Sequence, residues 1–141
     1  MFGNDRNQLR RLYCDAWAAR QRGEPLDPLA HQIAEVIEAH PEYQALVEDP
    51  QAALGAEYTP EMGQTNPFLH MGMHLAIREQ VSTDRPAGIR AAWQQLVARL
   101  GEHEAEHRMM ECLGQAIWEA QRSRREPDEA QYLECLRRLA G

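Results

Sequence analysis

The sequence predicts an all-α fold, an irregular helical bundle of about five to seven helices. Apolar residues recur at spacings of three and four along most of the chain, which is the period of an amphipathic helix. Prolines stand where a first helical turn would begin, and no alternation of apolar and polar residues is long enough to predict a strand. With 141 residues, of which 43% are hydrophobic and 26% charged, the chain is expected to form one domain over residues 1–141.

The first half of the chain predicts three helices, separated by breaks at glycine and proline: residues 5–21, 28–39 and 41–47. Asp27 stands directly before Pro28, and this pair is a start signal because the carboxylate caps the first turn and proline has no N–H to satisfy. Residues 48–64 are the least regular part and are predicted to form a long loop with short turns. Within them, Thr59 and Pro60 carry the same start signal.

The second half predicts four helices: residues 67–80, 87–100, 102–122 and 127–139. Asn66 and Pro67 begin the first of them, and Pro127 begins the last. Gly101 is predicted to separate the two central helices, because glycine costs about 1 kcal/mol in a helix interior and is favoured just past a helix end. The alternative is one unbroken helix over residues 87–122.

The net charge of −7 argues against a nucleic-acid-binding surface. No apolar stretch approaches the length of a membrane span, and residues 1–11 are polar, without the apolar segment of a secretory signal. We therefore expect a cytoplasmic protein that binds neither nucleic acid nor membrane. A homodimer is compatible with these features, which identify no protein partner.

The three cysteines, Cys14, Cys112 and Cys135, are an odd number, widely spaced and without a Cys-x-x-Cys pair. This pattern favours neither a disulfide framework nor a thiolate zinc site. All three lie among apolar residues of predicted helices, so we interpret them as small core residues.

The most informative feature is a repeated histidine spacing: His70 and His74 are four residues apart, and so are His103 and His107. Residues four apart lie one turn apart on the same helix face, so each pair presents two imidazoles in one direction. Imidazole nitrogen suits divalent transition metals, and four histidines satisfy zinc, with iron or nickel as alternatives. The sequence therefore predicts all four as ligands of one shared metal ion.

Gly101 decides whether the two pairs meet. A break there makes the two histidine-bearing helices parallel, with His70 beside His103 and His74 beside His107. An unbroken helix would separate the pairs by about 15–20 Å at 1.5 Å per residue, which would exclude a shared site. The predicted metal site therefore depends on the predicted break.

Two carboxylates accompany the second pair. Glu111 continues the stripe of His103 and His107, and is predicted either as a fifth ligand or as the partner of Arg78. Glu104 is offset from His103 by about 100° around the helix, where a general base would stand if the protein is an enzyme. For both carboxylates the other interpretation is a solvated side chain near a helix N-terminus.

Three functions stay open. The first is a metal-binding helical-bundle protein, and the second is a metal-dependent hydrolase that uses the same site with an open coordination position. The third is a helical interaction or regulatory module without a metal, whose histidines are polar core or surface residues. Residues 103–107 fit the His-Glu-x-x-His pattern of zinc proteases, but no histidine follows His107 and no strand is predicted to align a peptide, so a protease is not favoured.

Two segments carry a resemblance to a known family. They are Gly-Gln-Thr-Asn-Pro-Phe-Leu-His over residues 63–70, with His74 following, and Met-Glu-Cys-Leu-Gly over residues 110–114. With them the chain resembles, over nearly its full length to the tail at residues 132–135, a family of short, uncharacterised proteobacterial helical proteins with two His-x-x-x-His pairs. The resemblance implies a bacterial cytoplasmic protein, and it supplies no substrate.

Overall fold

The computed structural model describes residues 2–58 and 66–141 and divides the chain into two compact units, residues 1–75 and 76–141. The described residues form eight helices and no strand. The all-α class is therefore confirmed, with one helix more than the predicted five to seven. That residues 1–141 fold as one cooperative domain stays a prediction.

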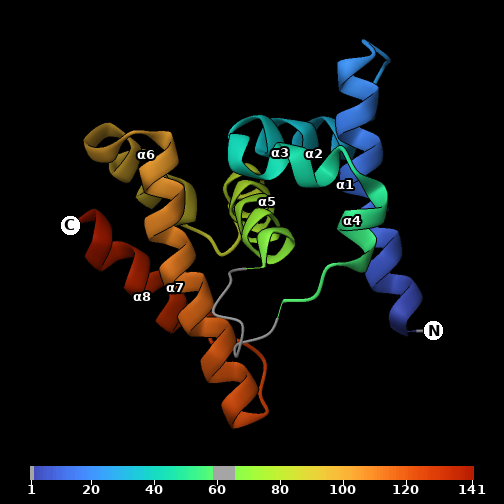
Figure 1. Cartoon of the computed structure of the whole chain (residues 1–141). Coiled ribbons are helices and arrows are strands. Elements are labelled where there is room, and N and C mark those ends of the chain that lie inside the picture. The colour runs from blue at the N-terminus through green and yellow to red at the C-terminus, as the bar shows by residue number, and fades with distance from the viewer. Residues whose placement is uncertain (1, 59–65) are drawn as a thin grey trace. The chain divides into compact units, whose positions relative to one another are not determined.

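The first unit contains four helices and the beginning of a fifth: α1 (Phe2–Gln21), α2 (Pro28–Glu38), α3 (Pro41–Val47), α4 (Pro50–Gly55) and α5 (Pro67–Thr83). In Figure 1, α4 lies along α1, which also packs against α2. Buried apolar side chains from all five helices form its core: Tyr13, Cys14, Ala16, Trp17, Ile33, Val36, Ile37, Val47, Ala53, Phe68 and Met71. These contacts position the residues of α5 that precede Ala76.

Helix starts in this unit follow the capping signals in the sequence. The Asp27 carboxylate accepts the Ala30 N–H at 2.8 Å, and the Asn66 amide oxygen accepts the Phe68 N–H at 2.9 Å. Helix α4 is a correction, because it lies within the predicted loop over residues 48–64. Asp49 caps it in the same way, so the missed start was the Asp49 and Pro50 pair. The predicted start at Thr59 and Pro60 lies outside the described residues.

A buried arginine joins α1, α4 and α5. Arg10 is 4% exposed, and its Nη1 donates to the carbonyl oxygens of Ala53 and Ala56 at 2.8 and 2.7 Å. Carbonyls at a helix C-terminus have no partner within the helix, so the guanidinium supplies one. The same guanidinium lies 4.8 Å from the centre of the Phe68 ring, in the first turn of α5. This contact holds the turn that precedes the α5 histidines.

The second unit contains the end of α5 together with α6 (Ile89–Leu100), α7 (Glu102–Ser123) and α8 (Glu129–Ala140), which pack against one another (Figure 1). Gly101, at φ 84° and ψ 165°, ends α6 and precedes α7, so the predicted break is confirmed. Only glycine adopts this backbone region without strain. Helix α8 begins two residues after Pro127, because Asp128 is its cap and accepts the Gln131 N–H at 3.1 Å.

The buried face of α7 covers only the first part of the helix. Met110 and Leu113 are buried, whereas Ile117 and Trp118 are 37% and 53% exposed. The buried positions of α7 end at Leu113, so the apolar residues beyond it do not contribute to the core of the unit. The Arg122 guanidinium instead covers the Trp118 ring, 4.7 Å from its centre.

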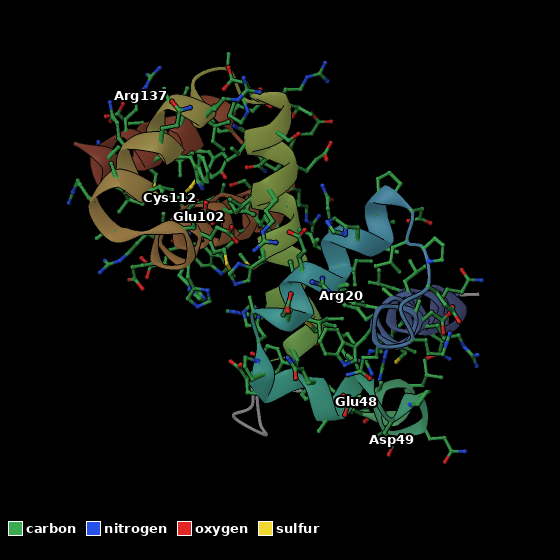
Figure 2. The ribbon with its side chains drawn as sticks, turned by 90° about the horizontal axis from the view of Figure 1, so that it is seen from above. Arg20, Glu48, Asp49, Glu102, Cys112 and Arg137 are labelled. Carbon is green, nitrogen blue, oxygen red and sulfur yellow. A yellow bond between two sulfur atoms is a disulfide. The ribbon has the colours of Figure 1, made fainter. Side chains whose placement is uncertain are left out.

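The cysteine interpretation is wrong for two of the three residues. Cys112 on α7 and Cys135 on α8 form a disulfide, with Cα atoms 5.8 Å apart (Figure 2). Cys14 keeps a free thiol and is buried in the core of the first unit, as predicted. The pairing depends on how α7 packs against α8, which residue spacing does not reveal.

Among the helices of the described residues, none is long and apolar enough to cross a membrane.

Candidate metal centre

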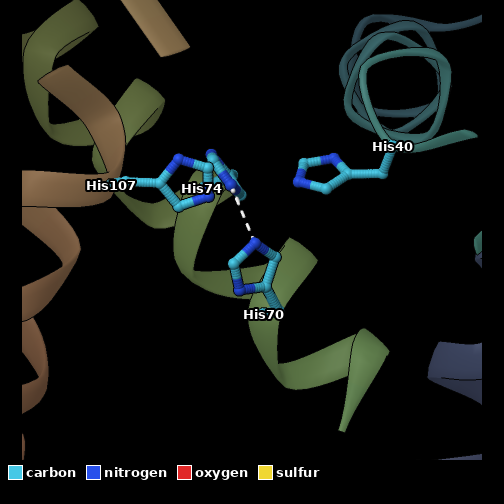
Figure 3. Close-up of side chains that lie close together, drawn as sticks. All are labelled: His40, His70, His74 and His107. Atoms are coloured by element: carbon cyan, nitrogen blue, oxygen red, sulfur yellow. Dashed lines mark hydrogen bonds between the residues drawn. The ribbon is translucent and has the colours of Figure 1, made fainter. Parts of the chain in front are cut away.

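Three histidines of the first unit form a cluster, shown in Figure 3: His40, His70 and His74. His70 and His74 lie one turn apart on α5, and His40 is the residue that precedes α3. The Nε2 atoms of His70 and His74 are 3.2 Å apart. One ring nitrogen of each of the three residues lies within 4.8 Å of those of the other two. The predicted α5 pair is therefore joined by a histidine that the spacing argument did not use.

The backbone orients the ring of His40. Its Nδ1 lies 2.7 Å from the carbonyl oxygen of Val36, near the C-terminus of α2. Since a carbonyl only accepts hydrogen bonds, Nδ1 carries the proton and Nε2 carries the lone pair of the neutral ring. Metal-binding histidines in proteins commonly have this arrangement, because the second hydrogen bond fixes both tautomer and ring orientation.

The nitrogen separations fit one small ion. With bonds near 2.1 Å, two nitrogens on one zinc stand about 3.4 Å apart at a tetrahedral angle and about 3.0 Å at a right angle. The 3.2 Å between His70 and His74 falls between these values. The other separations in the cluster, up to 4.8 Å, would close with side-chain shifts of about 1 Å.

The cluster is shielded unevenly from solvent. His40 and His74 are 2% and 1% exposed, whereas His70 is half-buried. The Tyr43 ring stacks on His40, with centres 5.4 Å apart and planes within 8°. Burial, followed by the charge of Glu42, raises the pKa of the Tyr43 phenol, so it is a neutral neighbour at pH 7. Solvent therefore reaches the cluster from the side of His70.

The second predicted pair, His103 and His107, lies in the first turns of α7 in the other unit. The two rings are 4.2 Å apart, as expected for residues one turn apart on one face. The His107 Nδ1 lies 3.1 Å from the His103 carbonyl oxygen, so in the neutral ring Nδ1 donates and Nε2 carries the lone pair, as in His40. His103 is exposed and His107 is half-buried.

The carboxylates of α7 differ from the sequence expectation. Arg78 pairs with Glu106 at 3.1 Å, so the alternative in which Glu111 is the partner of Arg78 is wrong. Glu106 is buried and Glu111 exposed, since the two residues lie about 140° apart around the helix. Glu104 is also exposed and pairs with Arg108 at 3.0 Å. This agrees with the interpretation of Glu104 as a solvated side chain near the helix N-terminus.

Sequence reasoning missed His40. It precedes Pro41 at the junction of α2 and α3, and no fixed spacing links it to the α5 histidines. The remaining histidine, His31, lies on the exposed side of α2 and contacts Glu35 one turn later. The local feature that could have drawn attention to His40 is its position before a proline that begins a helix, and this position by itself does not indicate a metal ligand.

Comparison with known proteins identifies the family and leaves the function open. No curated protein and no solved structure matches the chain. A family model matches residues 5–138, nearly the whole sequence. The chain therefore belongs to the family described as a domain of unknown function, DUF1841.

Proposed function

We propose that the protein binds one divalent transition-metal ion through His40, His70 and His74. The observation that carries the proposal is the 3.2 Å separation of the His70 and His74 Nε2 atoms, beside a His40 whose Nε2 lone pair is set by its bond to Val36. A set of imidazoles suits zinc first, with iron or nickel as alternatives.

We include His107 as a fourth ligand. Its support is the repeated spacing in the sequence and the tautomer set by the His103 carbonyl. His103 and Glu111 stay in the proposal as alternatives to His107 for the fourth position and, being exposed, are expected to contribute less.

The number of protein ligands separates a binding role from a catalytic one. Four imidazoles close a tetrahedral zinc shell, as in structural sites. Three leave a position for water, as in zinc hydrolases, and the half-buried His70 is the side from which water would reach it. In that second candidate function, Glu104 is the proposed general base.

The test is metal analysis of the untagged protein and its variants. We expect about one equivalent of metal in the wild-type protein after exposure to Zn²⁺, and its loss in His74→Ala and His40→Ala. His31→Ala is the matched control and should retain the metal, because His31 lies on the exposed side of α2 and is not part of the cluster. Absence of bound metal, together with no change in Tm with Zn²⁺, Ni²⁺ or Fe²⁺, would contradict the proposal and favour a metal-independent interaction module.

Cobalt substitution tests for the open position. If three histidines hold the ion, azide should shift the visible spectrum of the Co²⁺ protein by replacing bound water. If His107 completes the shell, azide should leave the spectrum unchanged in the wild-type protein and shift it in His107→Ala. A spectrum that azide does not shift in either protein would remove His107 from the ligand set and the hydrolase from consideration.

A further inference from the structure

The Cys112–Cys135 disulfide lies in the wall of a pocket in the second unit. The pocket has a volume of about 240 Å³ and is bounded by the later turns of α7, residues 125–128 and the first turns of α8. Figure 2 shows the position of Cys112 on α7. The volume suits a molecule of a few heavy atoms, and both cysteines contribute to the lining.

The two sulfur-bearing residues differ in accessibility. Cys112 is 3% exposed, whereas Cys135 is half-buried. Cys135 is therefore the more accessible of the two residues. Cys14 provides an internal reference, because it is buried in the other unit and burial raises the pKa of its thiol.

We propose that this disulfide is an exchangeable bond, opened by a small thiol that enters the pocket and attacks Sγ of Cys135. The thiolate RS⁻ forms a bond to Cys135 Sγ, the Cys112–Cys135 bond breaks, and Cys112 leaves as a thiolate that takes a proton from water. A second RS⁻ attacks the mixed disulfide, which releases RSSR and the Cys135 thiolate. Two small thiols are oxidised in total, and one protein disulfide is reduced.

The charge of the pocket selects the class of thiol. Three carboxylates line it, Glu119, Glu126 and Asp128, against one guanidinium, that of Arg125. Glu119 is partly neutralised by its pair with Arg122 at 3.1 Å. The remaining field is negative, so a cationic aminothiol is favoured over an anionic thiol of similar size.

An exchangeable bond also fits the cytoplasmic location that the sequence predicts. Disulfides are rare in reducing compartments, and those that occur there are commonly transient. Without the disulfide, α8 keeps polar contacts to α6 and to the end of α5 in its unit. The Arg99 guanidinium donates to the Leu139 carbonyl oxygen at 3.0 Å, and the Tyr132 hydroxyl donates to Gln80 at 2.6 Å. Reduction would therefore loosen α8 from α7 and leave its other attachments in place.

The first experiment measures reduction of the oxidised full-length protein by two thiols under native conditions. Cysteamine and 3-mercaptopropionate are compared at equal thiolate concentration, and mixed disulfides are mapped by peptide mass spectrometry. We expect mixed disulfides on Cys135. We also expect cysteamine to reduce the disulfide several-fold faster than 3-mercaptopropionate, and the two rates to become equal at high salt. Adducts on Cys112, or reduction only as fast as global unfolding, would overturn the proposal.

Variants test the charge argument separately. Glu126→Gln should reduce the preference for cysteamine, and Glu129→Gln, which changes an exposed carboxylate outside the pocket lining, should not. Equal effects of the two substitutions would show that overall charge, rather than the pocket, sets the preference.

A third measurement compares single thiols. Cys135 in the Cys112→Ser variant should be alkylated by iodoacetamide about tenfold faster than Cys112 in the Cys135→Ser variant. Equal rates would contradict the assignment of Cys135 as the attacked sulfur. The mapping on the wild-type protein gives an independent answer if either variant folds poorly.

Discussion

The two His-x-x-x-His pairs have the same spacing and different surroundings. The pair on α5 includes a side chain that is 1% exposed, and the third imidazole of His40 lies beside it. The pair on α7 begins in the first turn of its helix, where His103 is exposed and His107 is bonded to its own helix backbone. Spacing therefore puts two imidazoles on one face, but burial and neighbouring helices decide whether they resemble a metal site.

The largest expected effect tests this contrast directly. Replacing His70 and His74 by alanine should weaken zinc binding by more than about 100-fold. Removing a ligand lowers the metal affinity more than removing a residue that only supports a ligand, which itself costs about 10- to 100-fold. Replacing His103 and His107 should have a smaller effect, since one of the two is exposed. Competition with a chromophoric chelator measures both affinities. A larger loss from the α7 pair would reverse the comparison.

The disulfide should contribute the next largest effect, and in the second unit only. Closing a loop between cysteines 23 positions apart stabilises the folded state by roughly 3 kcal/mol in the chain-entropy description. Urea unfolding of the oxidised protein and of the Cys112→Ser/Cys135→Ser variant measures the difference. Hydrogen exchange should increase in α7 and α8 and stay unchanged in α1 and α2. An equal increase in both units would instead indicate one cooperative domain.

Arg10 should have the corresponding effect in the first unit. Arg10→Met keeps much of the packing on Phe68 but leaves the Ala53 carbonyl without its charged donor, whereas the Ala56 carbonyl still accepts from Arg6 Nη2. We expect a loss of about 2 kcal/mol in the free energy of unfolding. The exposed Arg11 on the same helix gives the matched control, as Arg11→Met. Similar losses from both substitutions would show that the Arg10 hydrogen bonds contribute little.

The smallest effects compare two ion pairs of the second unit. Glu106→Gln breaks a pair in which the glutamate side chain is 8% exposed, and we expect a loss of about 1–2 kcal/mol. Glu104→Gln breaks an exposed pair with Arg108, for which about 0.3–0.5 kcal/mol is expected. Thermal unfolding at equal ionic strength measures both. A loss from Glu111→Gln as large as that from Glu106→Gln would contradict the pairing of Arg78 with Glu106.

Local features of the fold were predictable because short-range chemistry sets them. Asp27 and Asn66 cap the helices that they precede, and Gly101 separates α6 from α7 as its backbone freedom indicates. The missed helix α4 carries the same signal at Asp49 and was obscured by its length of six residues. Helices this short are stabilised by their contacts more than by propensity.

The candidate site was predictable only in part. The spacing identified His70 and His74, but His40 belongs to another helix junction, and its proximity depends on the packing of α2 and α3 near α5. The choice of Glu106 over Glu111 has a similar origin. The two glutamates lie about 140° apart around α7. Which of them meets Arg78 depends on which side of α7 is buried in the second unit.

The sequence by itself determined the helical class, most helix boundaries and the i,i+4 presentation of each histidine pair. These depend on capping, on backbone freedom and on the 3.6-residue turn, all of which act between near neighbours. Tertiary structure alone decided that His40 joins His70 and His74, and that Cys112 meets Cys135. Such contacts join residues far apart in the chain, and they follow from which helix faces are buried together, a property that no local pattern encodes.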